Sequence, residues 1–383
     1  MLERLNREMD WSWLPTIAQA VIEEAVTIQQ IPAPTFDEAA RAAYVERRFQ
    51  ELGLVEVETD SLFNVYGKLA GTQSQPSGLM VAAHTDTVFP AETNLTTRAE
   101  NALIYGPGLG DNSMGVAGML GLIVVLQQQK IRPPCDLWFV ATTREEGLGD
   151  LGGMKAAFAR LQHCIQQVIN LEGLAFGHIY HAGIAVRRLH IKATAAGGHS
   201  WLHFGRASAI HGIMQLGAKI TALKPPESPR TTFNIGMIDG GQSINSIATH
   251  ASLWLDLRSE ARYTLEQLEQ TVHGLIKGLT QDDLRFEVEV VGDRPAGQIA
   301  TDHPLVLMAM AALDEVGVRG SLETGSTDGN VPLAAGCPTV TIGITRGGNA
   351  HRLDEYIETE PVAAGLKQLV LLALAASQSG ITA

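Results

Sequence analysis

GLMVAAHTDTV, residues 78–88, is the stretch of the sequence that says most about the fold. Leu79 to Ala83 form an apolar run without polar alternation, which is typical of a parallel strand covered on both faces. His84 and Asp86 follow at the carboxyl end of this run. Because they are two residues apart, their side chains face the same way. Asp86 can then accept a hydrogen bond from one ring nitrogen of His84 while the other nitrogen faces a metal ion.

Three further strand-like runs lead to side chains that can bind a metal. The run 137–141 leads to Glu145 and Glu146, the run 168–171 leads to Glu172, and the run 339–344 leads to His351. The glycine-rich segment GPGLGDNSMG, 106–115, contributes Asp111 just before an apolar helical run. In open α/β sheets, sites form in the crevice outside the carboxyl ends of the strands. The sequence therefore predicts a metal site with these candidate ligands: His84, Asp111, Glu146, Glu172 and His351.

This set of ligands favours two zinc ions, with cobalt or manganese as alternatives, because it contains His, Asp and Glu but no thiolate. Two ions about 3.5 to 4 Å apart need a bridging carboxylate and a bridging water that deprotonates near neutral pH. Asp111 is the natural bridge. We assign His84 and Glu172 to one ion. Glu146 and His351 are assigned to the other.

Glu145 is the candidate general base of this site. Successive side chains of a strand point in opposite directions, so we expect Glu146 to bind metal while Glu145 acts on the attacking water. Taken singly, each residue has a simpler explanation. A Glu-Glu pair is usually a solvated turn, a lone histidine is more often structural, and Asp111 could be a helix N-cap. The glycine-rich segment could also be a phosphate loop, but it lacks the Gly-Lys-Ser/Thr ending and carries an acid where phosphate would bind.

Composition limits the class of protein. The 383 residues are 45% hydrophobic and 18% charged, which is typical of a globular chain long enough for two domains. The net charge of -13 argues against general affinity for nucleic acid or for an anionic membrane. Cys135, Cys164 and Cys337 are too scattered for a disulfide framework or a zinc knuckle. We see neither the apolar core of a signal peptide nor about 18 consecutive apolar residues, and expect a cytoplasmic protein.

The order of predicted elements indicates an α/β fold in two domains. Alternating strands and helices predict a mostly parallel sheet in a di-zinc catalytic domain, residues 1–182 and 295–383. Between them, residues 183–294 follow the order β-α-β-β-α-β of a ferredoxin-like domain, with one sheet face exposed. Nearer the N-terminus, Thr35 and Glu38 have the spacing of a capping box, which predicts a helix start there.

The motifs together resemble the M20 metallopeptidases and amidohydrolases. The resemblance covers nearly the whole chain in the family's order. It rests on HTDTV, the glycine-rich segment with Asp111, TREEG, LEG with Glu172, GGHS with His199, and the segment around His351. Relatives of this kind include tripeptide aminopeptidase-like (peptidase T-like) and carboxypeptidase G-like enzymes, acetylornithine deacetylase and succinyl-diaminopimelate desuccinylase.

The resemblance implies roles for individual residues. Asp86 would orient His84, Glu145 would be the base, and the five ligands would be those named above. The inserted domain would serve as a dimerisation and lid domain that pairs two subunits of a homodimer. His199 would reach the partner's active site and stabilise the oxyanion, a role that matters only as charge develops. Taken alone, His199 would more often be a turn residue.

Two residues of the inserted domain are candidate substrate contacts. In LWLDLRS, residues 253–259, Arg258 could clamp a substrate carboxylate, and the alternative is an exposed ion pair with Asp256. Asn245, in GGQSINSIA, resembles an asparagine with which the family approaches its substrate, and the alternative is ordinary turn chemistry. The chain departs from many members at Asn112, Ser113 and Met114, directly after Asp111, where those members carry a lysine or methionine pattern.

From these observations we expect a zinc-dependent exopeptidase that cleaves an amide bond in small peptides by means of a metal-bridging hydroxide. The alternative is an N-acyl amino acid deacylase of the acetylornithine deacetylase or desuccinylase type. Glu172 resembles the deacylase members, since many peptidase members have Asp there. Outside enzymes, the chain could be a catalytically silent metal-binding protein. Glu145 beside a ligand argues against that, because a binding protein has no need of a base.

Overall fold

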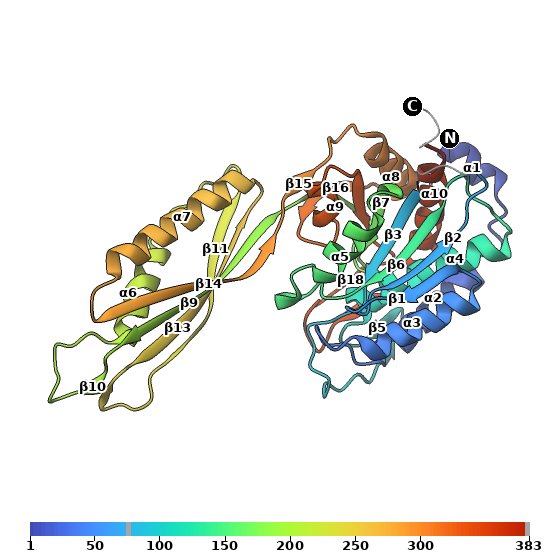
Figure 1. Ribbon diagram of the computed structural model, residues 1–383. Coiled ribbons are helices and arrows are strands. Elements are labelled where there is room, and N and C mark those ends of the chain that lie inside the picture. The colour runs from blue at the N-terminus through green and yellow to red at the C-terminus, as the bar shows by residue number, and fades with distance from the viewer. Residues whose placement is uncertain (74–77, 380–383) are drawn as a thin grey trace. The chain divides into compact units, whose positions relative to one another are not determined.

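The computed structural model describes residues 1–73 and 78–379 (Figure 1). Its internal contacts divide the chain into two compact units. Unit 1 comprises Met1–Gly183 and Gly297–Ala383, and unit 2 comprises Ile184–Ala296.

Unit 1 is built on a nine-stranded sheet in the order β1-β2-β6-β3-β7-β17-β8-β15, with β16 paired to β8. The central strands β6, β3, β7 and β17 run parallel, whereas β1, β2 and β15 pair antiparallel with their neighbours. This mixed α/β architecture confirms the predicted fold class at that level. The strands are β1 (Val55–Thr59), β2 (Val65–Leu69), β3 (Gly78–His84), β6 (Leu137–Thr142), β7 (Ile165–Leu171), β8 (His178–Gly183), β15 (Gly297–Gln298), β16 (Ser321–Gly325) and β17 (Thr339–Ile342).

Strand β3 is buried along its whole length, as its apolar run predicts. Leu79, Val81 and Ala83 belong to the larger apolar core of unit 1. Met80 and Ala82 belong to a second core on the opposite face, which includes residues of helix α5 (Gly152–Leu161). The strand is therefore covered on both faces, and its carboxyl end is the place where a polar side chain can leave the core.

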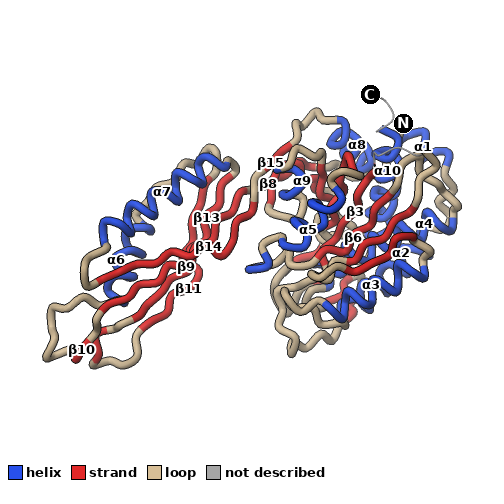
Figure 2. The backbone as a smooth tube through the Cα atoms, viewed as in Figure 1, coloured by secondary structure: helices blue, strands red, loops and turns tan. Residues whose placement is uncertain are grey.

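Helices flank the sheet of unit 1 (Figure 2). They are α1 (Leu2–Glu8), α2 (Leu14–Gln29), α3 (Ala39–Glu51), α4 (Gly115–Gln128), α5 (Gly152–Leu161), α8 (Pro304–Asp314), α9 (Asn330–Ala334) and α10 (Val362–Ser379), with the short helical turns η1 (Leu109–Met114) and η2 (Gly147–Gly149). Among the described residues, Leu109–Gln128 is long and apolar enough to cross a membrane, but 89% of its most apolar window is buried inside the protein. It is a core helix of unit 1.

A small second sheet in unit 1 joins distant parts of the chain. It contains β4 (Arg98–Glu100), β5 (Leu103–Tyr105), β18 (Gly347–Gly348) and β19 (Tyr356–Glu358) in the order β18-β19-β5-β4. Strands β4 and β5 are three residues long each and follow one another closely in the chain. The pairing of β19 with β5 brings the chain around His351 beside the chain that leads into η1.

Unit 2 contains a four-stranded antiparallel sheet in the order β11-β13-β9-β14 and a two-stranded sheet, β10-β12. Leu253, Leu255 and Leu257 alternate along β13 and pack in the same apolar core as helices α6 and α7. The elements are β9 (Ala185–Ala195), β10 (Gly198–His199), α6 (Ala209–Thr221), β11 (Thr231–Gly240), β12 (Ser246–Ile247), β13 (His250–Ser259), α7 (Arg262–Leu279) and β14 (Leu284–Arg294).

The capping box predicted at Thr35 is wrong. Helix α3 begins at Ala39 with no side-chain cap bond, and the Thr35 hydroxyl instead donates to the Asp86 carboxylate (2.9 Å). The Glu38 carboxylate accepts hydrogen bonds from the backbone N–H groups of Phe36 and Arg144. Tertiary partners therefore replace the local capping pattern that the spacing favoured.

Candidate metal centre

All five predicted ligands lie together in unit 1, at the end of the sheet where the parallel strands finish. His84 is the last residue of β3, and Glu172 directly follows β7. Glu146 lies in the turn after β6, Asp111 lies in η1, and His351 follows β18. This placement follows from the topology, because the carboxyl ends of parallel strands meet at one edge of a sheet.

Asp111 lies between the two histidines. Its Oδ1 is 3.1 Å from Nε2 of His84, and its Oδ2 is 3.0 Å from Nε2 of His351. Glu172 Oε2 is 3.5 Å from the same nitrogen of His84, and Glu146 Oε1 is 3.0 Å from the same nitrogen of His351. Asp111 therefore belongs to two groups of potential ligands at once, with His84 and Glu172 on one side and with Glu146 and His351 on the other.

The charges in this cluster favour a cation. Burial lowers the pKa of His84, but the carboxylates of Glu172, Asp111 and Asp86 outweigh it and raise that pKa well above its usual value. Hydrogen bonds to Asp111 and Glu146 raise the pKa of His351 to about 10. Burial raises the pKa of Asp111, but the two histidines outweigh it and leave that pKa below its usual value. The carboxylates thus attract positive charge to the two places where the histidine nitrogens lie, which is where divalent cations fit the donor set.

Asp86 forms hydrogen bonds to other groups besides His84. Its buried carboxylate accepts hydrogen bonds from the backbone N–H of Glu145 (2.9 Å), the backbone N–H of Glu146 (3.0 Å) and the hydroxyl of Thr35 (2.9 Å). His84 Nδ1 donates to the main-chain oxygen of Asp86 (3.1 Å) and lies 3.5 Å from its carboxylate. The Asp86 residue therefore holds His84 and the Glu-Glu turn in one arrangement.

The expectation that Glu145 and Glu146 point in opposite directions is wrong. Both side chains are 6% exposed. One carboxylate oxygen of Glu145, one carboxylate oxygen of Glu146 and a ring nitrogen of His84 all lie within 4.8 Å of one another. Strand β6 ends at Thr142, and Arg144 has a φ of +57°, so strand alternation no longer applies in this turn. Glu145 lies beside the cluster, where a general base would be needed.

Asn112 positions Glu172, a role that sequence reasoning missed. The buried side-chain amide of Asn112 donates to the carbonyl of Leu171 (2.8 Å) and accepts from the N–H of Gly173 (2.8 Å), on either side of Glu172. A Cβ at Gly173 would lie 2.2 Å from the carbonyl oxygen of Gly110, so only glycine allows this close approach. The only sequence signal was the departure from the family pattern directly after Asp111.

The three remaining predicted residues lie in unit 2. His199 is exposed, and its Nδ1 accepts from the N–H of Trp201 (3.2 Å), so the neutral ring carries its proton on Nε2. The main-chain carbonyl of Asn245 accepts a hydrogen bond from the N–H of Ser200 (3.0 Å), so Asn245 lies beside the segment that carries His199. Arg258 pairs with Asp256 (2.7 Å).

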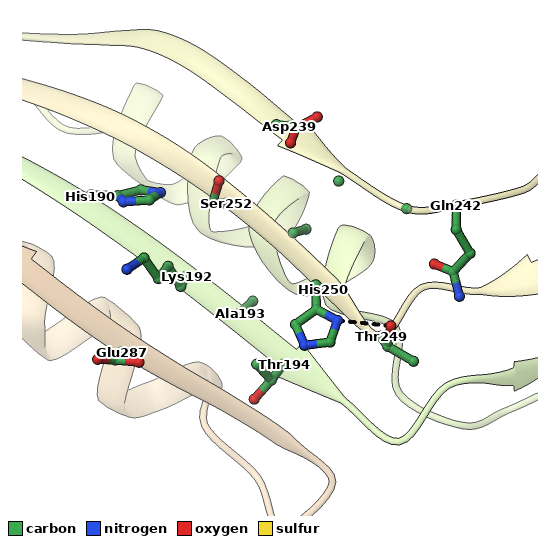
Figure 3. A pocket seen from close by; sticks show the side chains of 13 residues that line it. His190, Lys192, Ala193, Thr194, Asp239, Gln242, Thr249, His250, Ser252 and Glu287 are labelled. Carbon is green, nitrogen blue, oxygen red and sulfur yellow. Dashed lines mark hydrogen bonds between the residues drawn. The ribbon is translucent and has the colours of Figure 1, made fainter.

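A pocket of about 780 Å³ lies within unit 2, over strands β9 and β13 (Figure 3). The ring of His190 stacks on Trp254 with 4.0 Å between centroids, and the Nδ1 of His250 bonds the Thr249 hydroxyl (2.9 Å). Among the residues that the structure describes, every group of three or more potential metal ligands lies in unit 1, around His84 and Asp111. None of the residues that line this pocket belongs to those groups.

The chain is similar to known proteins over most of its length. The model of a family described as Peptidase family M20/M25/M40 matches residues 80–375. Succinyl-diaminopimelate desuccinylase of Corynebacterium glutamicum is 28% identical over 88% of this chain and 92% of the relative. Acetylornithine deacetylase of Salmonella typhi is 28% identical over 81% of this chain and 84% of the relative. Among solved structures, aminopeptidase PepT of Bacillus cereus superposes with a TM-score of 0.76 at 24% identity, covering 94% of this chain and 99% of that one.

Proposed function

The chain belongs to peptidase family M20/M25/M40, and on that premise we propose that it is a zinc-dependent exopeptidase that cleaves amide bonds in small peptides. Membership confirms the resemblance noted in the sequence. It also makes hydrolysis of an amide bond the activity to expect. The observation that carries the proposal is the position of Asp111, whose two carboxylate oxygens lie 3.1 Å and 3.0 Å from the Nε2 atoms of His84 and His351.

We infer that the cluster holds two zinc ions per chain, with Co²⁺ or Mn²⁺ as substitutes. Asp111 would serve both ions, with His84 and Glu172 holding one, and Glu146 and His351 holding the other. When bound, such ions would polarise the scissile carbonyl and lower the pKa of the attacking water. Both histidines must be neutral to act as ligands, so binding would displace the protons that the carboxylates stabilise.

Glu145 would accept the proton of the attacking water and deliver it to the leaving nitrogen. Two observations support this role: Glu145 is 6% exposed beside the ligands, and Asp86 fixes its backbone N–H. A base held in place in this way loses little entropy when it acts, which is one source of the rate enhancement from general base catalysis.

Residues of unit 2 would complete the site across a homodimer. We propose that residues 183–294 form a ferredoxin-like dimerisation and lid domain inserted into a catalytic domain of 1–182 and 295–383. The order β-α-β-β-α-β and the antiparallel sheet support this proposal. His199 would donate from Nε2 to the oxyanion in the partner's site. Arg258 would exchange Asp256 for a substrate carboxylate, and Asn245 would contact the substrate beside it. We place the enzyme in the cytoplasm, acting on small molecules rather than on nucleic acid or membrane.

The second candidate is an N-acyl amino acid deacylase. It is favoured by the names of the two relatives, a desuccinylase and a deacetylase, which match most of this chain at 28% identity. Glu172 at the position where many peptidase members have Asp points the same way. Peptides and N-acyl amino acids share the amide bond that the site would cleave, so the metal centre itself does not separate the two activities.

Two measurements test the proposal. Elemental mass spectrometry on protein purified without added metal should find about two zinc ions per chain. The zinc-loaded enzyme should then hydrolyse members of a panel of dipeptides and tripeptides. Hydrolysis confined to N-acetyl or N-succinyl amino acids would favour the deacylase. Full metal binding without turnover of any member would instead indicate a catalytically silent metal-binding protein.

A further inference from the structure

Glu355 follows His351 by four residues and is fully buried. Its Oε1 accepts hydrogen bonds from the backbone N–H of Gly110 (2.7 Å) and of Asp111 (2.9 Å). Its Oε2 accepts from the N–H of Gly108 (3.1 Å), and its main-chain carbonyl accepts from the N–H of Gly106 (2.8 Å). One residue therefore receives four hydrogen bonds from the glycine-rich turn that carries the proposed bridge.

The turn needs such an acceptor because its backbone is irregular. Asp111 and Asn112 have non-helical dihedral angles, with φ of -111° and -132°, so the N–H groups before α4 cannot all find helical partners. A buried backbone N–H without an acceptor costs about 1–3 kcal/mol. A carboxyl group with two oxygens can accept hydrogen bonds from several N–H groups at once.

Glu355 also joins the two ligand-bearing segments. It lies between His351 and strand β19, and β19 pairs with β5, which leads into the turn. Tyr356 and Tyr105 face each other in this pairing, with ring centroids 5.5 Å apart. Two kinds of contact therefore join the segment carrying His351 to the segment carrying Asp111. They are the pairing of β19 with β5 and the hydrogen bonds that the Glu355 carboxylate accepts from the turn.

We propose that Glu355 is a positioning residue that fixes Asp111 relative to His351, and that the metal bound between these two depends on it. The inference rests on the two-metal function proposed above. Glu355 touches neither substrate nor the ligand atoms in this role, and it acts only through the backbone of the turn. Partners of this kind in other metal sites change metal affinity about 10–100-fold when they are removed.

The test compares Glu355→Gln and Glu355→Ala with Glu358→Gln. Gln keeps one oxygen that can accept from Gly110 and Asp111, but it presents an NH₂ group to Gly108. Glu358→Gln makes the same replacement in the same segment, three residues further on, and serves as the matched control. Metal-free forms of each variant and of the wild type are titrated with zinc by calorimetry, and their urea unfolding midpoints are measured.

We expect the dissociation constant of the more weakly bound zinc to rise about 10–100-fold in Glu355→Gln and further in Glu355→Ala, with no change in the control. In the loaded enzyme kcat should fall while KM changes little, because the substrate contacts are untouched. Lower unfolding midpoints with wild-type zinc affinity in Glu355→Gln would overturn the inference and leave Glu355 a purely structural acceptor. If Glu355→Ala does not fold, Glu355→Gln still decides. Absence of zinc uptake by the wild type would instead overturn the proposed function, and this inference with it.

Discussion

Replacing Asp86 with Asn should destabilise the metal-free protein and slow the enzyme. The buried carboxylate accepts from the backbone N–H of Glu145 and of Glu146 at 2.9 and 3.0 Å, and from the Thr35 hydroxyl at 2.9 Å. Asn has the same shape, but one of its two terminal atoms is an NH₂ donor. Whichever way the amide turns, one backbone N–H of the Glu-Glu turn then faces another donor.

The size of the effect follows from these contacts. A hydrogen bond to a charged group contributes about 1.5–3 kcal/mol, and a buried N–H left without an acceptor costs about 1–3 kcal/mol. The second N–H keeps a partner, but that partner is now neutral, so its bond is weaker. We therefore expect the free energy of unfolding to fall by about 3–5 kcal/mol. Thr35→Val removes only the hydroxyl bond to this carboxylate and should cost less, about 1.5–3 kcal/mol.

Urea unfolding of the three metal-free proteins measures both effects. The reasoning fails if Asp86→Asn costs less than about 1 kcal/mol, or no more than Thr35→Val. The pH dependence gives a second check. Burial raises the pKa of Asp86, but its hydrogen bonds to His84 and to the two backbone N–H groups outweigh burial and lower that pKa overall. A carboxylate with a depressed pKa stabilises the fold above the pKa it has when unfolded, and this contribution is lost as the pH falls through the folded-state pKa. The gap between wild type and Asp86→Asn should therefore narrow in acid.

Three further predictions concern catalysis and binding. Glu145→Gln should bind zinc with wild-type affinity and lose about 10²–10⁴-fold in kcat, and retained turnover would remove Glu145 as the base. The metal-free protein should release about two protons per chain when it binds zinc at pH 7.5, because the pKa of His84 is well above its usual value and that of His351 is about 10. Calorimetric zinc titration in buffers of different ionisation enthalpy measures this release. Binding without proton release would contradict the charge state of the two histidines. Inactive Glu145→Gln and inactive His199→Ala chains should regain activity when mixed and allowed to exchange subunits, because one site then has both groups; no recovery in verified heterodimers would exclude His199 acting in the partner's site.

The positions of the candidate ligands could be predicted from the sequence because a topological rule places them. His84, Glu146 and Glu172 each follow a short apolar run, and parallel strands bring their carboxyl ends to one edge whatever the details of the loops. His351 and Asp111 were found in the same way, since one follows the run at Thr339 and the other precedes an apolar helix. This reasoning needs only the order and type of elements, which hydrophobic patterning indicates well.

The hydrogen bonds that hold the ligand-bearing turns could not be predicted from the sequence, because they join segments far apart in the chain. Thr35 has the local pattern of a helix cap, yet its hydroxyl donates to Asp86, 51 positions away. Glu355 is one acid in an acidic stretch, and its four donors lie about 250 residues earlier. The orientation of Glu145 was misjudged for a related reason. A left-handed φ at Arg144 is uncommon for a non-glycine residue, and no local signal announces it.

The contacts that the sequence did not predict have a common physical basis. The candidate ligands Asp111, Glu146 and His351 lie in irregular turns, where backbone N–H groups lack the partners that helices and strands supply, and buried carboxylates take their place. Glu38 accepts from the N–H of Arg144, Asp86 from the next two, and Glu355 from three in the turn before α4. Each acid is costly to bury: burial raises the pKa of Glu38 and raises that of Glu355 to about 7, whereas the pKa of Asp86 stays below its usual value. A neutral acceptor could fix the same backbone without strengthening the field at the metal centre. Asp86 therefore serves rigidity and cation affinity together, because it holds the Glu-Glu turn and keeps its negative charge beside His84.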